Sequence, residues 1–238
     1  MVSSFIESVI ASDARTHQGK VFLSFDIDWC SDEVLADTHA LCSNAGVRQT
    51  YFVTHDTDYL DVLAKDPLVS LGIHPNFLPL LKSEKNFSIE AELDRLKNIC
   101  PGSKVARSHG VVQGGLILKA FSEIGITHDS NDMIPMGAGL EIRPYETMYG
   151  ITKVPFSWAD EHEWAFGRDT PFSLILKLEK FLVFDFHPIH VFLNTESAER
   201  YEGTRNLHHK PKELINYRFG GRGTRSRLLE LLSQITHS

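Results

Sequence analysis

Short apolar runs alternate along the chain with longer segments whose apolar residues recur at helical spacing. Continuous apolar runs are typical of strands buried on both faces, and the helical segments end at residues such as Gly46 and Gly125. The predicted strands cover 21–27, 49–54, 70–74, 104–107 and 126–129, with further candidates at Ile142, 154–156 and 182–187. The predicted helices cover 4–14, 32–45, 58–65, 88–99, 113–124 and 224–235.

This alternation of strands and helices indicates an α/β protein with a parallel sheet. The chain has 238 residues, without an internal repeat or a linker rich in Pro, Gly and Ser. We therefore expect a single domain that spans 1–238. Its length fits a barrel of about seven βα units, slightly fewer than the eight of a full-size barrel.

The first predicted strand ends in two acids, Asp26 and Asp28, separated by Ile27. Side chains alternate faces along a strand, so both carboxylates are expected to leave the same face at its C-terminal end. Carboxylates at the end of an apolar strand are costly to place unless a metal or a reaction uses them. Active sites of α/β folds are built at that end of the sheet, although solvated or helix-capping acids are the plain alternative.

The composition narrows the function classes. With 42% hydrophobic and 23% charged residues the chain is ordinary globular protein. A net charge of −7 without a Lys/Arg-rich block argues against a nucleic-acid partner. Neither a membrane span nor a signal peptide is evident, and the scattered Cys30, Cys42 and Cys100 fit free thiols, so we expect a cytoplasmic protein.

Histidines follow several of the apolar runs. Asp28, His74, His109 and His187 offer mixed nitrogen and oxygen ligands suited to Zn²⁺ or another divalent first-row metal. A catalytic zinc commonly keeps three protein ligands and an open position for water. Asp28, His74 and one further histidine would suffice, while the remaining histidines also fit plain turn or hydrogen-bonding roles.

A metal at this point would acidify a water molecule and polarise a substrate carbonyl. Asp26 would take the proton of the water as general base, and Arg107 at another strand end would pair with Asp26 and orient it. A histidine across the pocket would protonate the leaving group, and His187 is favoured because it directly ends an apolar run. This chemistry is the hydrolysis of an amide or an ester.

Five segments, in this order along the chain, resemble motifs of the polysaccharide deacetylases, the NodB-homology group of carbohydrate esterases. They are Phe25-Asp26-Ile27-Asp28-Trp29, the segment 45–54, Gly72-Ile73-His74-Pro75-Asn76, Arg107-Ser108-His109-Gly110 and Phe186-His187-Pro188. The set is also similar to a divergent branch associated with surface-polysaccharide gene clusters, the WbmS-like proteins. This resemblance implies a distorted (β/α)7 barrel and a metal-dependent removal of an acyl group from an amino sugar.

The resemblance also implies roles for individual residues. By position, Asp26 is the general base, and Asp28 and His74 are metal ligands. Arg107 is the partner of the base, and His187 is the general acid.

The chain departs from the family's pattern at two points. Ile27 separates the two acids that are usually adjacent, and Leu78 stands where a second metal-binding histidine is usual. We expect His109 to replace that ligand. Otherwise His187 is the third ligand, and the acid role passes to His190 or to water.

Substrate contacts are expected from four further residues. Trp158 would stack on a sugar ring and Asp160 would bind hydroxyls or an amine, although a core tryptophan beside a surface acid fits equally well. Arg143 would hold a carboxylate or phosphate, and Asp129 would help to orient or tune the acid.

The sequence thus favours a cytoplasmic, metal-dependent hydrolase that removes an N-acyl group from an amino sugar or sugar precursor in surface-polysaccharide biosynthesis. Zn²⁺ is the expected metal, with Co²⁺, Ni²⁺ or Mn²⁺ as alternatives. Two other functions remain open: hydrolysis of another carbon–nitrogen amide, and a non-catalytic barrel that binds a glycan.

Overall fold

A computed structural model describes residues 1–82, 86–135, 138–178 and 181–236 of the chain. Its strands are β1 (Val2–Ser3), β2 (Lys20–Asp26), β3 (Gln49–Val53), β4 (Val69–Ile73), β5 (Val105–Ala106), β6 (His128–Asp129), β7 (Tyr145–Glu146), β8 (Thr152–Lys153), β9 (Trp158–Ala159) and β10 (Leu182–Phe186). Its α-helices are α1 (Asp32–Asn44), α2 (Leu60–Lys65), α3 (Leu78–Leu81), α4 (Ile89–Ile99), α5 (Gly115–Glu123), α6 (Asp160–Ala165), α7 (Phe172–Leu178), α8 (Pro188–Leu193), α9 (Ala198–Gly203), α10 (Pro211–Leu214) and α11 (Thr224–Thr236).

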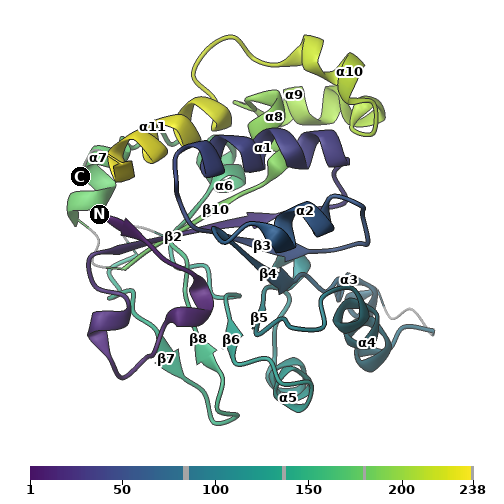
Figure 1. Ribbon diagram of the computed structural model, residues 1–238, viewed down its shortest axis with the longest axis vertical. Helices are drawn as coiled ribbons and strands as arrows, with labels where there is room; N and C mark the ends of the chain where they lie inside the picture. The colour runs from purple at the N-terminus through teal and green to yellow at the C-terminus, as the bar shows by residue number, and fades with distance from the viewer. Residues whose placement is uncertain (83–85, 136–137, 179–180, 237–238) are drawn as a thin grey trace.

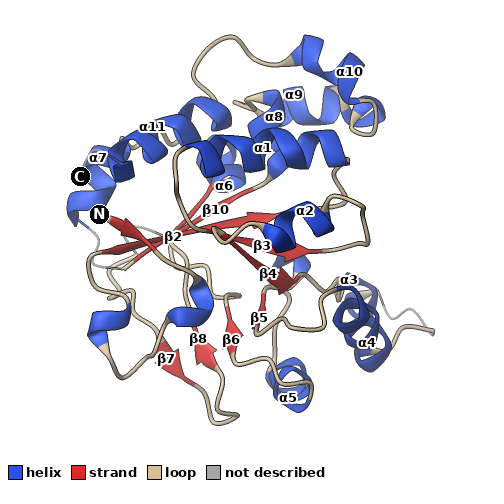
Figure 2. Ribbon diagram, in the orientation of Figure 1, coloured by secondary structure: helices blue, strands red, loops and turns tan. Residues whose placement is uncertain are grey.

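All of these strands belong to one curled sheet with the order β7-β8-β6-β5-β4-β3-β2-β10-β9 and with β1 beside β2. The pairings are parallel except between β7 and β8. Helices α1, α8 and α11 cover one side of this sheet, and α4 and α5 lie beside its other half (Figures 1 and 2). The expected distorted barrel of the deacetylase type is confirmed, as a half-barrel whose strand path ends at β7 and β9.

Most of the elements follow the predicted pattern. Ser88 caps α4 as expected, because its hydroxyl accepts a hydrogen bond from the Ala91 N–H at 3.1 Å. The strand candidate at Ile142 was wrong, since this residue lies in the loop before β7. In the candidate 154–156, only Phe156 pairs, through an isolated bridge to Met133, because β8 ends at Lys153.

The sheet separates two hydrophobic clusters. The larger one joins outward residues such as Leu23 and Phe184 to side chains of the helices, for example Val34 and Leu228. The smaller one lies on the inner, concave face and contains alternate residues of the same strands. Its strand members are Phe22, Phe52, Val105, Ala159 and Val183.

The N-terminal segment closes the inner face at the amino ends of the strands. A helix over 4–14 was predicted, but the segment instead forms two 3₁₀ turns, Ile6–Ser8 and Ala14–Thr16. Ile6 and Val9 join the inner apolar cluster, and the Val9 carbonyl accepts a hydrogen bond from His128 Nε2 at 2.8 Å. Burying these residues in the sheet's opening favours an irregular path over a free amphipathic helix.

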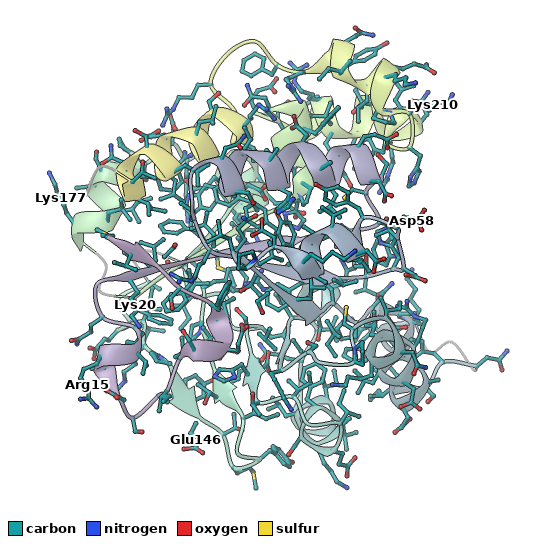
Figure 3. All side chains as sticks on the ribbon, viewed as in Figure 1. Arg15, Lys20, Asp58, Glu146, Lys177 and Lys210 are labelled. Carbon is teal, nitrogen blue, oxygen red and sulfur yellow. The ribbon has the colours of Figure 1, made fainter. Side chains whose placement is uncertain are left out.

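Charged side chains occupy both the surface and the interior. Arg15, Lys20, Glu146, Lys177 and Lys210, which are labelled in Figure 3, project outward from widely separated elements. No helix in the described part of the chain is long and apolar enough to cross a membrane. The charges that matter for chemistry are buried at the carboxyl ends of the strands.

Candidate active site

The turn after β2 places Asp28. The strand ends at Asp26, and the Cys30 N–H donates to the Ile27 carbonyl at 2.9 Å, which closes a tight turn around Asp28 and Trp29. The two carboxylates do face the same cavity, as predicted, but Asp28 is not a continuation of the strand. The tight turn, rather than strand alternation, brings the second carboxylate to the mouth of the half-barrel.

This turn has an unusual backbone. Asp28 has a φ of 37° and Trp29 a φ of 56°, both in the left-handed region that bulky residues rarely adopt. The Trp29 N–H donates to Thr54 Oγ1 at 3.1 Å, which ties the turn to the end of β3. Such backbone strain is concentrated at functional sites, where surrounding contacts hold it in place.

Three potential metal ligands converge at this turn. Asp28 Oδ1 lies 3.3 Å from His74 Nε2 and 3.1 Å from His109 Nδ1. One ligand atom from each of these residues lies within 4.8 Å of the others. His74 is held in place by its backbone N–H, which donates to the Val53 carbonyl at 2.8 Å.

The donor set fits a divalent cation. A carboxylate oxygen and two imidazole nitrogens are ligands that zinc prefers. Burial alone would raise the pKa of Asp28, but hydrogen bonds from His109 and His74 and the nearby His187 hold it far below its usual range. Burial opposes protonation of His74, yet Asp26 and Asp28 raise its pKa. The pocket thus stabilises positive charge between its side chains.

Beneath this cluster lies a buried ionic layer. Arg107 Nη1 donates to Asp26 Oδ1 at 3.0 Å and also hydrogen-bonds Asp185. The guanidinium lies between the rings of Phe52 and Phe156, 4.5 Å from each centroid. The structure therefore forms the predicted contact between Arg107 and Asp26, and it adds a second carboxylate to the same guanidinium.

This layer carries more negative than positive charge. One guanidinium faces two carboxylates, and burial together with the charge of Asp26 raises the pKa of Asp185 to about 7 against the opposing charge of Arg107. The other oxygen of Asp26 points toward the metal-ligand cluster, with Oδ2 3.7 Å from His74 Nε2. Asp26 is thus fixed from below by Arg107 and faces the pocket above.

His187 stands on the opposite side of the same pocket, directly after β10. Asp160 holds it twice, since its carboxylate accepts the His187 backbone N–H and Nδ1–H, both at 2.8 Å. The free Nε2 lies 3.3 Å from Glu161 Oε1 and 3.8 Å from Asp28 Oδ2. Burial opposes protonation, but Glu161, Asp160 and Asp28 raise the pKa of His187 well above its usual value.

A cavity of about 370 Å³ joins these groups. Five residues predicted as catalytic or metal-binding line it together. They are Asp26, Asp28, His74, His109 and His187. Arg107 is fully buried beneath the cavity and reaches it through Asp26.

The four residues predicted to contact substrate lie elsewhere or act indirectly. Trp158 is buried and packs on Phe186, with ring centroids 4.6 Å apart, rather than lining this cavity. Asp160 is buried beside His187. Arg143 is exposed and lines a separate cavity with Glu141.

Asp129 does not contact the predicted acid. It pairs with Lys153 Nζ at 2.8 Å and accepts a hydrogen bond from the side chain of Asn131 at 2.7 Å. Asn131 in turn accepts the Ser108 N–H at 2.8 Å, directly before His109. Asp129 therefore supports the loop that carries a predicted metal ligand, and Asp160 makes the contact with His187.

Three residues of the site were not assigned from the sequence. Asp185 interrupts an apolar strand just as Asp26 does, which was a usable signal. Glu161 follows the predicted Asp160 but carries no pattern of its own. Trp29 is 38% exposed beside His109, with ring centroids 5.1 Å apart, and only the turn's geometry reveals this position.

These features are those of a polysaccharide deacetylase. The family model of the WbmS-like polysaccharide deacetylases matches residues 23–205. The chain belongs to this family.

One solved structure resembles almost the whole chain. It is WbmS from Bordetella bronchiseptica, described as a polysaccharide deacetylase involved in O-antigen biosynthesis. The two chains share 37% sequence identity with a TM-score of 0.94, over 98% of this chain and 97% of the other.

Two more distant structures were also matched. A family 4 carbohydrate esterase from Streptomyces lividans shares 12% identity over 92% of this chain and 91% of its own, with a TM-score of 0.48. A 4-alpha-glucanotransferase from Thermococcus litoralis shares 16% identity over 85% of this chain and 39% of its own, with a TM-score of 0.51, and supports the fold alone. No curated protein matches the sequence.

Proposed function

We propose that the protein is a metal-dependent hydrolase that removes the N-acetyl group from an amino sugar during surface-polysaccharide biosynthesis. The observation that carries this proposal is the arrangement of one cavity. Three convergent metal ligands lie between a carboxylate fixed by a buried arginine and a histidine fixed by a buried carboxylate.

Asp28, His74 and His109 would hold the ion, for which Zn²⁺ is the preferred choice. When bound, such an ion lowers the pKa of a water ligand and polarises an amide carbonyl. His109 thus supplies the ligand that Leu78 does not. The alternative ligand, His187, is 3.8 Å from the other oxygen of Asp28 and is already committed to Asp160 through Nδ1.

Asp26 is the proposed general base. Its Oδ1 is held by Arg107, which leaves Oδ2 to accept the proton of the attacking water. His187 is the proposed general acid. Because its Nδ1–H is bound to Asp160, the protonated ring directs its Nε2–H into the cavity, where the leaving amine is released.

Substrate recognition is proposed for the rim of the cavity. Trp29 is half-exposed beside His109 and provides an aromatic face for a sugar ring. Glu161 lines the same cavity and is placed to bind a hydroxyl or the amine that deacetylation forms. The O-antigen assignment of the Bordetella neighbour and the buried free thiols support a sugar of a cell-surface glycan, handled in the cytoplasm.

A non-catalytic barrel that binds a glycan is the second candidate. The observation that favours it is Leu78 in place of the usual metal-binding histidine. A non-catalytic function of this kind requires that His109 does not replace the missing histidine as a metal ligand.

The test is metal content measured by mass spectrometry on untagged protein, together with release of acetate from N-acetylated sugars. We expect about one divalent ion per chain, lost in His74→Ala and in His109→Ala and retained in the control His209→Ala, whose side chain is exposed. A wild-type protein that binds neither Zn²⁺, Co²⁺ nor Ni²⁺ contradicts the hydrolase. If the metal-loaded protein releases acetate only from non-sugar amides, the function is instead hydrolysis of another carbon–nitrogen amide.

A further inference from the structure

A second cavity, of about 240 Å³, lies on the other side of β9 and α6 from the candidate active site. The residues of this segment divide between the two cavities. Ala159, Glu161 and His162 line the active-site cavity. Trp158, Asp160, Glu163 and Trp164 line the second one, which α11 closes with Arg227.

The walls of this cavity contain polar atoms without hydrogen-bond partners among the described residues. They are Trp158 Nε1, Trp164 Nε1, Arg227 Nε and Glu163 Oε2. The residues Trp158, Glu163 and Arg227 are 1%, 5% and 6% exposed, so bulk water does not satisfy them. Glu163 Oε2 forms a 3.4 Å ion pair with Arg227 Nη2, and the Glu163 carboxylate also interacts with the side chain of Trp158.

Unpaired polar atoms in one place require an explanation. Each costs free energy comparable to a lost hydrogen bond when nothing binds it, and native proteins contain few of them. Here they gather around one hollow, whose volume is that of roughly eight liquid waters. That hollow is large enough for one small ligand with several polar groups.

The unmet groups define the chemistry of this ligand. Three are N–H donors, and one is a carboxylate oxygen that accepts. A ligand that satisfies them must therefore both accept and donate hydrogen bonds. Hydroxyl groups do both, and the two indoles that line the hollow offer flat apolar faces between the polar contacts.

Charge argues against an anion in this cavity. Two of its three cationic side chains are already paired: Arg227 with Glu163 and Asp169, and Arg222 with Asp169 at 2.9 Å. The third, Arg168, lies over the ring of Phe166. The carboxylates that line the cavity outnumber its guanidinium groups by four to three. The carboxylates are Asp160, Glu163, Asp169 and Glu196, and the guanidinium groups are Arg168, Arg222 and Arg227.

We propose that this second cavity binds one uncharged sugar residue, separate from the sugar that is deacetylated. The site goes beyond the proposed hydrolysis and does not depend on a metal. Asp160 forms part of its wall and also holds His187, so an occupant contacts the residue that orients the proposed acid.

The distribution of tryptophans provides a direct test. The chain has three tryptophans: Trp158 and Trp164 line the second cavity, and Trp29 lies at the active-site turn. Protein labelled with ¹⁵N at the indole nitrogens is titrated with D-glucose, D-galactose and D-mannose, which carry no acyl group. The three signals are assigned with Trp29→Phe and Trp164→Phe.

We expect at least one of these sugars to shift the Trp158 and Trp164 signals and to leave Trp29 unchanged. Glu163→Gln, which keeps the shape of the side chain, should weaken that titration about tenfold, because a charged hydrogen-bond acceptor is lost. The matched control Glu161→Gln, on the active-site side of α6, should leave it unchanged.

Three outcomes overturn the proposal. One is the absence of any shift at Trp158 and Trp164 with all three sugars, which leaves the polar atoms to water. The second is a shift confined to Trp29. The third is a response to inorganic phosphate but to none of the sugars, which identifies an anion site. None of these outcomes depends on metal content or on acetate release, so the proposed hydrolysis stands or falls separately.

Discussion

The two ends of the sheet's inner face differ sharply although the same strands build both. Along β2 the inward residues change from Phe22 near the start to Asp26 at the end. Residue 105 of β5 is an inner valine, and Arg107 follows two positions later. The amino ends are apolar and closed by the N-terminal segment, whereas the carboxyl ends hold an ionic layer beneath an open cavity.

The difference shows what each half contributes. Burial of apolar side chains stabilises the fold without regard to direction. The ionic layer is held by mutual hydrogen bonds and by the aromatic rings around Arg107, and replacing such layers by apolar residues is often neutral or stabilising. The ionic half, at the carboxyl ends of the strands, is therefore best explained by the chemistry of the cavity that it supports.

The largest expected effect is a loss of turnover when Asp26, at the carboxyl ends of the strands, is replaced. Asp26→Asn should lower kcat by about 10²–10⁴, since the amide cannot take the proton of the water. Metal content should stay at the wild-type value, because Asp26 lies outside the cluster of Asp28, His74 and His109. Acetate release and metal analysis on the same preparation check both. Wild-type turnover would remove Asp26 as the base.

Two substitutions compare the halves directly through stability. Phe22→Ala leaves a cavity in the apolar half, and Arg107→Met removes the cation that two buried carboxylates, Asp26 and Asp185, share. Each should lower the free energy of unfolding by about 3–5 kcal/mol, measured by urea denaturation.

The two variants should differ in activity per folded molecule. That activity should be retained in Phe22→Ala and lost in Arg107→Met. Adding Asp185→Asn to Arg107→Met should recover part of the stability and none of the activity. Equal losses of specific activity in both single variants would refute the division of roles.

The pH dependence of stability should single out Asp185. Burial raises its pKa to about 7, so the folded state holds this proton more tightly than the unfolded chain does. The resulting stability is fully present below the unfolded pKa and is lost as the pH rises through about 7.

Asp185→Asn removes this contribution. From pH 5 to pH 8 the variant should gain about 2–3 kcal/mol of stability relative to the wild type. Urea denaturation of both metal-free proteins at the two pH values measures this. Parallel stability curves would show that the Asp185 carboxyl does not keep its proton in the folded protein.

The smallest effect is expected at Arg143. It is exposed and lines a cavity at the N-terminal segment with Glu141 and His17. Arg143→Ala should therefore leave kcat and KM within about twofold of the wild type. A large rise in KM would place the substrate far beyond the cavity that contains Asp28.

The sequence predicted which residues line the cavity better than it predicted how the backbone brings them there. Residues that end apolar runs, such as Asp26, His74 and His187, do line one cavity, because parallel strands bring their carboxyl ends together. Asp28 reached the same cavity through a left-handed turn that periodicity does not encode. The N-terminal helix was wrong because tertiary burial overrode local propensity.

Contacts between distant segments were the least predictable. Asp160 was expected to touch substrate, yet it lies behind His187, because the face of a short helix such as α6 is set by packing. Asp129 was expected near the acid but pairs with Lys153 of the neighbouring strand β8. Such partners depend on how the sheet curls, which no local pattern specifies.

The pairing of β2 with β10 has a consequence for how the protein reaches its native state. Ser24 and Asp185 hydrogen-bond across 161 positions of the chain, so this junction closes a very large loop. Contacts of such high sequence separation form slowly, after local helices and neighbouring strands. The proposed base, Asp26, and the proposed acid, His187, lie at the ends of the two strands that meet at this junction. A chain that is still emerging from the ribosome therefore cannot assemble the active-site cavity until β10 has been made.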